Sequence, residues 1–182
     1  MKRIIFFIFL LVCELSSNAQ TMPSVAGVTF GQSYENCKSI LDKQYNNGKT
    51  SYQLTANELH YLDIRFGGSY FDYVDFDFQV VSGVSHLCRI EFVSRFDLSD
   101  SKMAKAQRDA LLDTFKDKYE IRWDGINDSG YAYYVLGHNP LKTEDGFVVI
   151  ETYKGKSNGG KLFLWTTVTY GPVYTVDVKD EI

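Results

Sequence analysis

The stretch YFDYVDFDF, residues Tyr70–Phe78, sets three aspartates among aromatic and aliphatic side chains. In a β-strand successive side chains point to opposite faces, so alternate positions share a face. Even-numbered positions from Asp72 onward are then mostly apolar, while Asp75 and Asp77 fall on the odd face together with Tyr73. The stretch is therefore predicted to be a strand with one buried and one solvent-facing side, rather than a cluster of metal-binding carboxylates.

The segments on either side follow the same parity. Even positions there are apolar: Leu62, Ile64, Phe66, Cys88, Ile90 and Phe92. Odd positions are mostly polar or aromatic: Tyr61, Asp63, Arg65, Arg89, Glu91, Val93 and Arg95. Three strands of one parity predict an antiparallel sheet with one wet face. Equal parity also requires a three-residue loop, Gly67–Ser69, and allows Asp77 to pair with Arg89 across the next two strands.

Periodicity along the rest of the chain predicts an α+β fold. A helix is expected after Ser33, a good N-cap, with an apolar stripe of Tyr34, Cys37, Leu41 and Tyr45. A longer helix is expected at about 100–119. Strands are expected near 51–55, 59–66, 71–81 and 87–96, then near 121, 131–136, 147–153, 162–170 and 173–178.

The order of these elements suggests an internal duplication. The helix ends, Tyr45 and Tyr119, differ by 119 − 45 = 74 residues, and corresponding strands near 71 and 145 have the same offset. The hypothesis is two αββββ half-repeats, at about 27–98 and 99–182, with the helices packed on one face of the sheet. The alternative is a single α+β domain with two unrelated helices.

An even offset carries the parity scheme into the second half. Its core-facing positions are then Val148, Ile150, Leu162, Leu164 and Val168, and its outer face is rich in aromatic residues. Exposed aromatic patches usually mark binding surfaces. The alternative is that the other half-sheet, the tail from Gly171 onward or a second subunit covers this face. The predicted binding residues, from both halves, are Tyr133, Tyr153, Phe163, Trp165, Tyr61, Tyr73, Asp75, Asp77, Arg89 and Arg95.

The sequence shows no catalytic or metal-binding motif, so neither catalytic residues nor a cofactor is predicted. His60, His86 and His138 lack metal-ligand spacing, and Ser33 lacks the second glycine of a nucleophile elbow. The resulting hypothesis is a non-catalytic binding module whose partner is a protein. A secreted hydrolase with scattered active-site residues and a lipid or peptide carrier remain the alternatives.

The first nineteen residues have the pattern of a secretory signal peptide. Lys2 and Arg3 precede an apolar run at 4–12, and cleavage is expected after Ala19. A secreted or periplasmic protein is therefore predicted. Lipid anchoring through Cys13 fits less well, because lipoprotein signal peptidases prefer a small residue where Val12 stands.

Removal of this segment takes away two basic and one acidic residue, leaving 17 basic and 22 acidic side chains, a net charge of 17 − 22 = −5. An acidic chain lacks the basic surface that nucleic acid requires. Residues 20–182 fit one domain, with no further segment apolar enough to span a membrane. Cys37 and Cys88 could form a disulfide in an oxidising compartment or remain two buried thiols.

A resemblance to known proteins rests on the opening motif GVTFGQSY, residues 27–34, followed by a helix that ends in DKQY, residues 42–45. This start looks like that of many small secreted proteins of Gram-negative bacteria. The predicted duplication resembles β-lactamase inhibitor proteins and, in each half, SmpA-type outer-membrane assembly lipoproteins. The resemblance implies a curved antiparallel sheet that binds other proteins without chemistry, and it carries over no functional residue.

Overall fold

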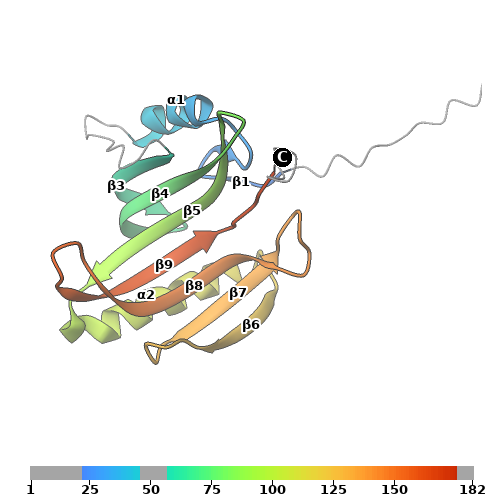
Figure 1. The fold of residues 1–182 in the computed structure, drawn as a ribbon. Coiled ribbons are helices and arrows are strands. Elements are labelled where there is room, and N and C mark those ends of the chain that lie inside the picture. The colour runs from blue at the N-terminus through green and yellow to red at the C-terminus, as the bar shows by residue number, and fades with distance from the viewer. Residues whose placement is uncertain (1–21, 46–56, 176–182) are drawn as a thin grey trace, which may run out of the picture.

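A computed structural model describes residues 22–45 and 57–175 of the chain (Figure 1). A short hairpin and a first helix precede three strands, and a second helix separates these from four more strands. The elements are β1 (Ser24–Val25), β2 (Val28–Thr29), α1 (Tyr34–Tyr45), β3 (Glu58–Phe66), β4 (Ser69–Val81), β5 (Val84–Phe96), a 3-10 turn η1 (Leu98–Asp100), α2 (Ser101–Phe115), β6 (Ile121–Ile126), β7 (Ala132–His138), β8 (Gly146–Lys156) and β9 (Leu162–Tyr170).

Within the described ranges the main sheet has seven antiparallel strands in the order β3-β4-β5-β9-β8-β7-β6. Strands β5 and β9 pair from Ile90↔Tyr170 to Phe96↔Leu164, so β9, the last of the described strands, joins the two groups of strands edge to edge. Figure 1 shows this junction in the middle of the sheet. The predicted α+β class with an antiparallel sheet is confirmed.

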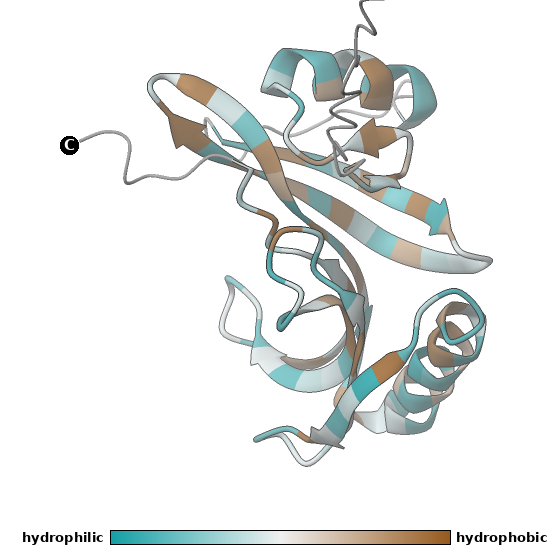
Figure 2. Ribbon diagram, turned by 90° about the vertical axis from the view of Figure 1, so that its right-hand side faces the viewer, coloured by the Kyte–Doolittle hydropathy of each residue, from teal (hydrophilic) through white to brown (hydrophobic). Residues whose placement is uncertain are grey.

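Both helices pack on one face of the sheet. Cys37 and Leu41 of α1 belong to the same buried cluster as Leu111 and Phe115 of α2. Figure 2 shows hydrophobic and hydrophilic residues alternating along the long strands, as expected for a sheet covered on one side. The strand residues of this covered face include Val74, Phe76, Phe78, Ile90, Phe92, Val148, Ile150 and Val168, all almost fully buried.

The helix boundaries follow the sequence in part. Ser33 Oγ accepts a hydrogen bond from the Asn36 amide at 3.4 Å, which is the expected N-cap of α1. Helix α2 ends at Phe115, and Tyr119 lies beyond it with its ring stacked on that of Phe115. The two helix ends are thus 115 − 45 = 70 residues apart rather than 74, and the duplication stays a prediction.

The prediction of a three-residue loop between β3 and β4 is wrong. Phe66 pairs with Ser69, so Gly67 and Gly68 form a two-residue hairpin turn. Their φ angles are +57° and +79°, the left-handed values that a type I′ turn requires and that glycine adopts without strain. This turn pairs odd positions of β3 with even positions of β4, such as Tyr61 with Val74.

The parity of β3 changes at Asp63, which has a φ of +56°. On the hairpin side of this residue Ile64 faces the core as predicted, whereas on the other side the core residues are Leu59 and Tyr61. Tyr61 is only 2% exposed, while Leu62, expected in the core, is 37% exposed. The placement of Tyr61 on the wet face is therefore corrected.

Strands β4 and β5 keep the predicted register over most of their length. Asp77 pairs with Arg89, as expected, and the Arg89 Nε donates to Asp77 Oδ2 at 2.7 Å. A bulge follows, because Phe78 pairs with Leu87 and leaves Cys88 as an extra residue. Leu87 rather than Cys88 therefore belongs to the main core cluster.

The two described cysteines are free thiols, so the possible Cys37–Cys88 disulfide is not formed. Cys37 lies in the core under α1, whereas Cys88 donates to the Asp77 carbonyl oxygen at 3.4 Å from the bulge. The bulge thus separates two thiols that strict alternation would have directed into one interface.

The predicted strand at 51–55 and the end of the predicted strand at 173–178 lie outside the described residues. Residues 173–175 form no strand, and Leu162, expected in the core, is 44% exposed near the β8–β9 turn. Among residues 22–45 and 57–175, no helix combines the length and the apolar composition needed to cross a bilayer.

Candidate binding face

The sheet face opposite the helices carries charged and aromatic side chains, and we call it the open face. It is built by the positions that alternate with the covered face on β3, β4, β5, β9, β8 and β7. Because β5 joins β9, the charged part on β4 and β5 is continuous with the aromatic part on β8 and β9. The two parts therefore form one continuous surface.

The middle of the open face is hollowed. A solvent-open depression of about 580 Å³ lies between β3, β4, β5, β9 and the β8–β9 turn. Three aromatic side chains line it, Tyr73, Tyr153 and Trp165, together with the charged residues Asp75 and Arg95. The Tyr73 and Trp165 rings meet edge to face with centroids 6.5 Å apart. All five residues belong to the set predicted from the sequence.

Cross-strand pairing brings these residues together. Trp165 on β9 lies between Arg95 on β5 and Tyr153 on β8, and it pairs with both. Directly opposite side chains in a sheet are close enough to contact one another. Register therefore fixes an arginine, a tryptophan and a tyrosine in one row across the sheet.

Gly155 makes room for the indole. A Cβ at Gly155 would lie 2.7 Å from the Trp165 Nε1, so the ring occupies the space that a side chain would fill. The same relation recurs toward the edge of the sheet, where a Cβ at Gly125 would lie 2.9 Å from the Tyr133 ring. Because each ring lies over glycine backbone, Trp165 and Tyr133 are partly buried rather than fully exposed.

Arg95 is held by aromatic contacts rather than by a carboxylate. Its guanidinium carbon lies 4.9 Å from the Phe163 ring centroid, and the Phe163 ring meets Trp165 edge to face at 6.0 Å. Within the described part of the chain its guanidinium forms no ion pair. An unpaired arginine beside a tryptophan is a typical contact point for a partner.

A group of four carboxylates, Glu58, Asp75, Asp77 and Glu91, occupies the β3–β5 part of the open face. Arg89 neutralises part of it, with contacts of 2.7 Å to Asp77 and 3.4 Å to Glu91. Burial, and then the Asp75 charge, raise the pKa of Glu91 despite the opposing effect of Arg89. Burial, Asp75 and Asp77 likewise raise the pKa of Glu58.

The tyrosines of the hollow remain protonated at neutral pH. Burial, with the nearby Glu91 and Glu151 charges, raises the pKa of Tyr153 to about 12. Burial and the Asp75 charge also raise the pKa of Tyr73 above its ordinary value. Both phenols therefore offer an apolar ring and a hydroxyl donor, a combination that is frequent in protein interfaces.

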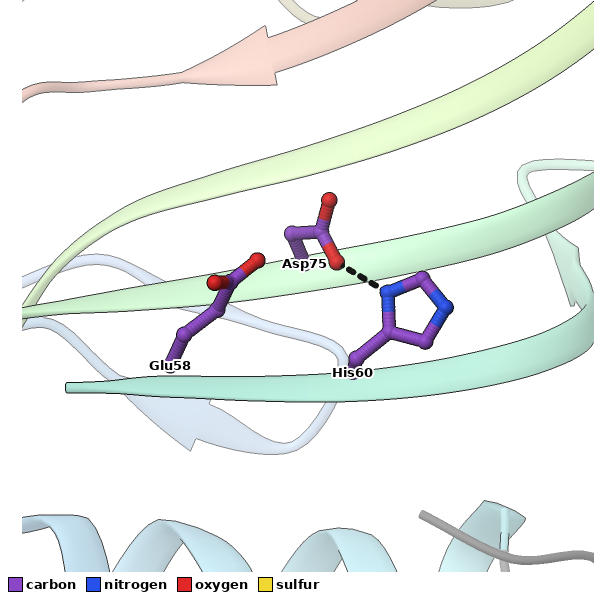
Figure 3. A group of neighbouring side chains, drawn as sticks. All are labelled: Glu58, His60 and Asp75. Carbon is purple, nitrogen blue, oxygen red and sulfur yellow. Dashed lines mark hydrogen bonds and ion pairs between the residues drawn. The ribbon is translucent and has the colours of Figure 1, made fainter. Parts of the chain in front are cut away.

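A second feature adjoins the hollow, whose lining includes His60 and Asp75. Figure 3 shows that Glu58 and His60 of β3 point toward Asp75 of β4. His60 pairs with Asp75 across the strands, and its Nδ1 lies 2.5 Å from the Asp75 Oδ1. The His60 ring also packs against Tyr73, with centroids 4.9 Å apart. The side chains of His60 and Asp75 are only 13% and 15% exposed, respectively.

The remaining predicted residues lie outside the hollow. Phe163 borders it, and Tyr133 lies toward the far edge of the sheet on β7. Asp77 and Arg89 line a separate depression with Pro172 and Tyr174. Tyr61 lies on the covered face.

Sequence reasoning missed His60 and the β8–β9 turn residues 157–159 as parts of the hollow, and Glu58 as a neighbour of His60. The even–odd parity that misplaced Tyr61 would also direct His60 toward the core, so the same inverted segment hides His60 from sequence reasoning. The sequence Ser157–Gly160 predicts a turn, but it does not predict toward which face of the sheet the turn lies.

Comparison of the chain with models of known protein families, with curated proteins and with solved structures finds no match.

Proposed function

We propose that the protein is a non-catalytic binding module, secreted or periplasmic, that holds a protein partner on the open face around Trp165. The observation that carries this proposal is the hollow in which Tyr73, Tyr153 and Trp165 surround Arg95 and Asp75. Aromatic and arginine side chains dominate interface hot spots, and charged residues around them supply orientation and steering. The expected signal peptide and the resemblance to β-lactamase inhibitor proteins support the same function.

The shape of the site favours a macromolecular partner over a small substrate. The hollow is wide and open to solvent, whereas small-molecule sites bury most of their ligand. Its walls come from residues held by sheet pairing, so a partner would meet a surface that is already formed. The hollow and the flanking acidic group together offer both an aromatic anchor and a charged border.

The chain offers a matched control for testing this proposal, because it contains two tryptophans. Trp123 lies on the edge strand β6, is 45% exposed and stacks under Arg122 at 4.6 Å, outside the hollow. Capture of a partner from the secreted fraction should be lost with Trp165→Ala and retained with Trp123→Ala. Titration of the purified partner should then show at least tenfold weaker binding to Trp165→Ala, corresponding to about 1.4 kcal/mol.

Equal binding by both variants would overturn the assignment of the surface. Thermal unfolding of each variant serves as the folding control, since a variant that fails to fold says nothing about contact. Hydrolysis of a peptide or ester by the wild-type protein, abolished by His60→Ala, would instead favour the hydrolase alternative, for which the His60–Asp75 hydrogen bond in the hollow is the supporting observation. Extraction of a bound lipid would favour the carrier.

A further inference from the structure

Three potential metal ligands converge beside the hollow, where His60 and Asp75 belong to its lining and Glu58 adjoins them. Glu58, His60 and Asp75 each bring one donor atom, and these atoms all lie within 4.8 Å of one another. Glu58 and His60 are two residues apart on β3 and so share a face, while Asp75 lies directly opposite His60 on β4. The convergence therefore results from strand pairing rather than from the chance position of a loop.

In the part of the chain that the structure describes, no lysine or arginine neutralises Glu58 or Asp75. Arg89 contacts Asp77 and Glu91, but in the described ranges neither Glu58 nor Asp75 forms an ion pair with a lysine or arginine. Partly buried carboxylates of like charge destabilise one another unless one takes up a proton or a cation lies between them. Among the described residues, His60 is the one basic group within ion-pair distance of Asp75, and an imidazole is also a metal ligand.

We propose that Glu58, His60 and Asp75 bind a divalent first-row transition-metal ion, with Zn²⁺ as the reference ion. One imidazole nitrogen and two carboxylate oxygens form a mixed set that suits such ions better than Ca²⁺ or Mg²⁺, which prefer oxygen alone. Three protein ligands leave a coordination position for water or for a group of a bound partner. The site does not depend on the proposed protein-binding function.

The donors need only a small rearrangement to bind the ion. With metal–ligand bonds of about 2.0–2.2 Å, donor atoms in a tetrahedral site are roughly 3.3 Å apart. The donor atoms now lie within 4.8 Å of one another. Rotation of the three side chains, with the backbone fixed, can bring them to the tetrahedral separation. The 2.5 Å contact between His60 Nδ1 and Asp75 Oδ1 is a hydrogen bond, which the ion must break in order to bind both atoms.

Calorimetric titration of the purified protein with Zn²⁺ tests this site. The wild-type protein should bind one ion per chain, and His60→Ala should bind at least tenfold more weakly. His138→Ala is the matched control, because His138 is exposed and contacts Arg122 and the Thr143 carbonyl, away from both carboxylates. Absence of binding to the wild-type protein, or equal binding by His60→Ala, would overturn the proposal.

Two isosteric variants keep the test informative where His60→Ala fails to fold. Glu58→Gln and Asp75→Asn preserve side-chain volume and remove the charge, and each should weaken Zn²⁺ binding by at least tenfold. Nitrogen-15 NMR of the histidine rings gives an independent readout, with a Zn²⁺-dependent shift at His60 and none at His86 or His138. Shifts at all three histidines would indicate unspecific surface binding and contradict the site.

Discussion

The two faces of the sheet contain many of the same residue types but use them differently. On the covered face Phe92 is fully buried, with the Phe66 ring stacked on it at 4.2 Å and the Phe71 ring at 5.4 Å. On the open face Trp165 is partly buried and meets Tyr73 and Phe163 only edge to face. Aromatic content alone therefore does not distinguish a core from a binding surface.

What distinguishes the faces is the way in which each ring is covered. Core rings pack among side chains of neighbouring strands and of the two helices, so their removal leaves a cavity. The Trp165 indole instead lies over the Gly155 backbone, with its other neighbours at the sides of a solvent-open hollow. Removal of such a ring exposes backbone to water, which can hydrate it, and the fold should lose little.

The largest expected difference in stability separates these two rings. Phe92→Ala should lower the free energy of unfolding by about 3–5 kcal/mol, because it creates a cavity in the main cluster. Trp165→Ala should cost less than half as much. Urea unfolding followed by circular dichroism measures both, and equal losses would show that the open face is part of the core.

A smaller effect is expected from the pH dependence of stability, through Glu91 on the open face. Its pKa is raised in the folded protein, mainly by burial, so the folded state favours the protonated form. Stability from this group is complete below its ordinary pKa of 4.5 and falls as pH rises through the folded value. Glu91→Gln should therefore unfold at a higher temperature than the wild type at pH 7, and the difference should shrink toward pH 4.

Exposed Glu144, in the loop between β7 and β8, provides the control for this measurement. Glu144→Gln should leave the pH profile of the melting temperature close to that of the wild type. A Glu91→Gln variant less stable than the wild type at pH 7 would mean that the 3.4 Å contact with Arg89 and the 3.3 Å contact with Thr169 outweigh the cost of burial.

The sequence predicted the element order and the faces of four strands well, because alternation of apolar residues reports burial directly. Val148 and Ile150 on β8, with Leu164 and Val168 on β9, lie in the core as expected. Alternation fails wherever the backbone leaves regular strand geometry. Asp63 has a positive φ that its residue type does not predict, because aspartate tolerates many backbone conformations. This φ inverts the assignment of half of β3.

The candidate site shows the same limit. Its row of Arg95, Trp165 and Tyr153 could be predicted, because each residue lies on a strand of regular parity. The contact of His60 with Asp75 could not, because it depends on the register set by the two-residue turn at Gly67 and Gly68. Pairing between strands is a property of turn geometry as much as of hydrophobic pattern.

The smallest expected effect concerns the ion pair between Asp77 and Arg89, a contact that parity predicted correctly. Its side chains are 30% and 44% exposed, so water and salt screen the attraction. A double-mutant cycle with Asp77→Asn and Arg89→Gln should give a coupling free energy of at most about 1 kcal/mol, decreasing at 1 M salt. The bulge beside the pair, between Asp77 and Phe78, makes the outcome informative about register. A coupling well above that value would indicate that the pair resists slippage at the bulge, whereas a negligible coupling would show that packing of Phe78 against Leu87 already fixes the strands.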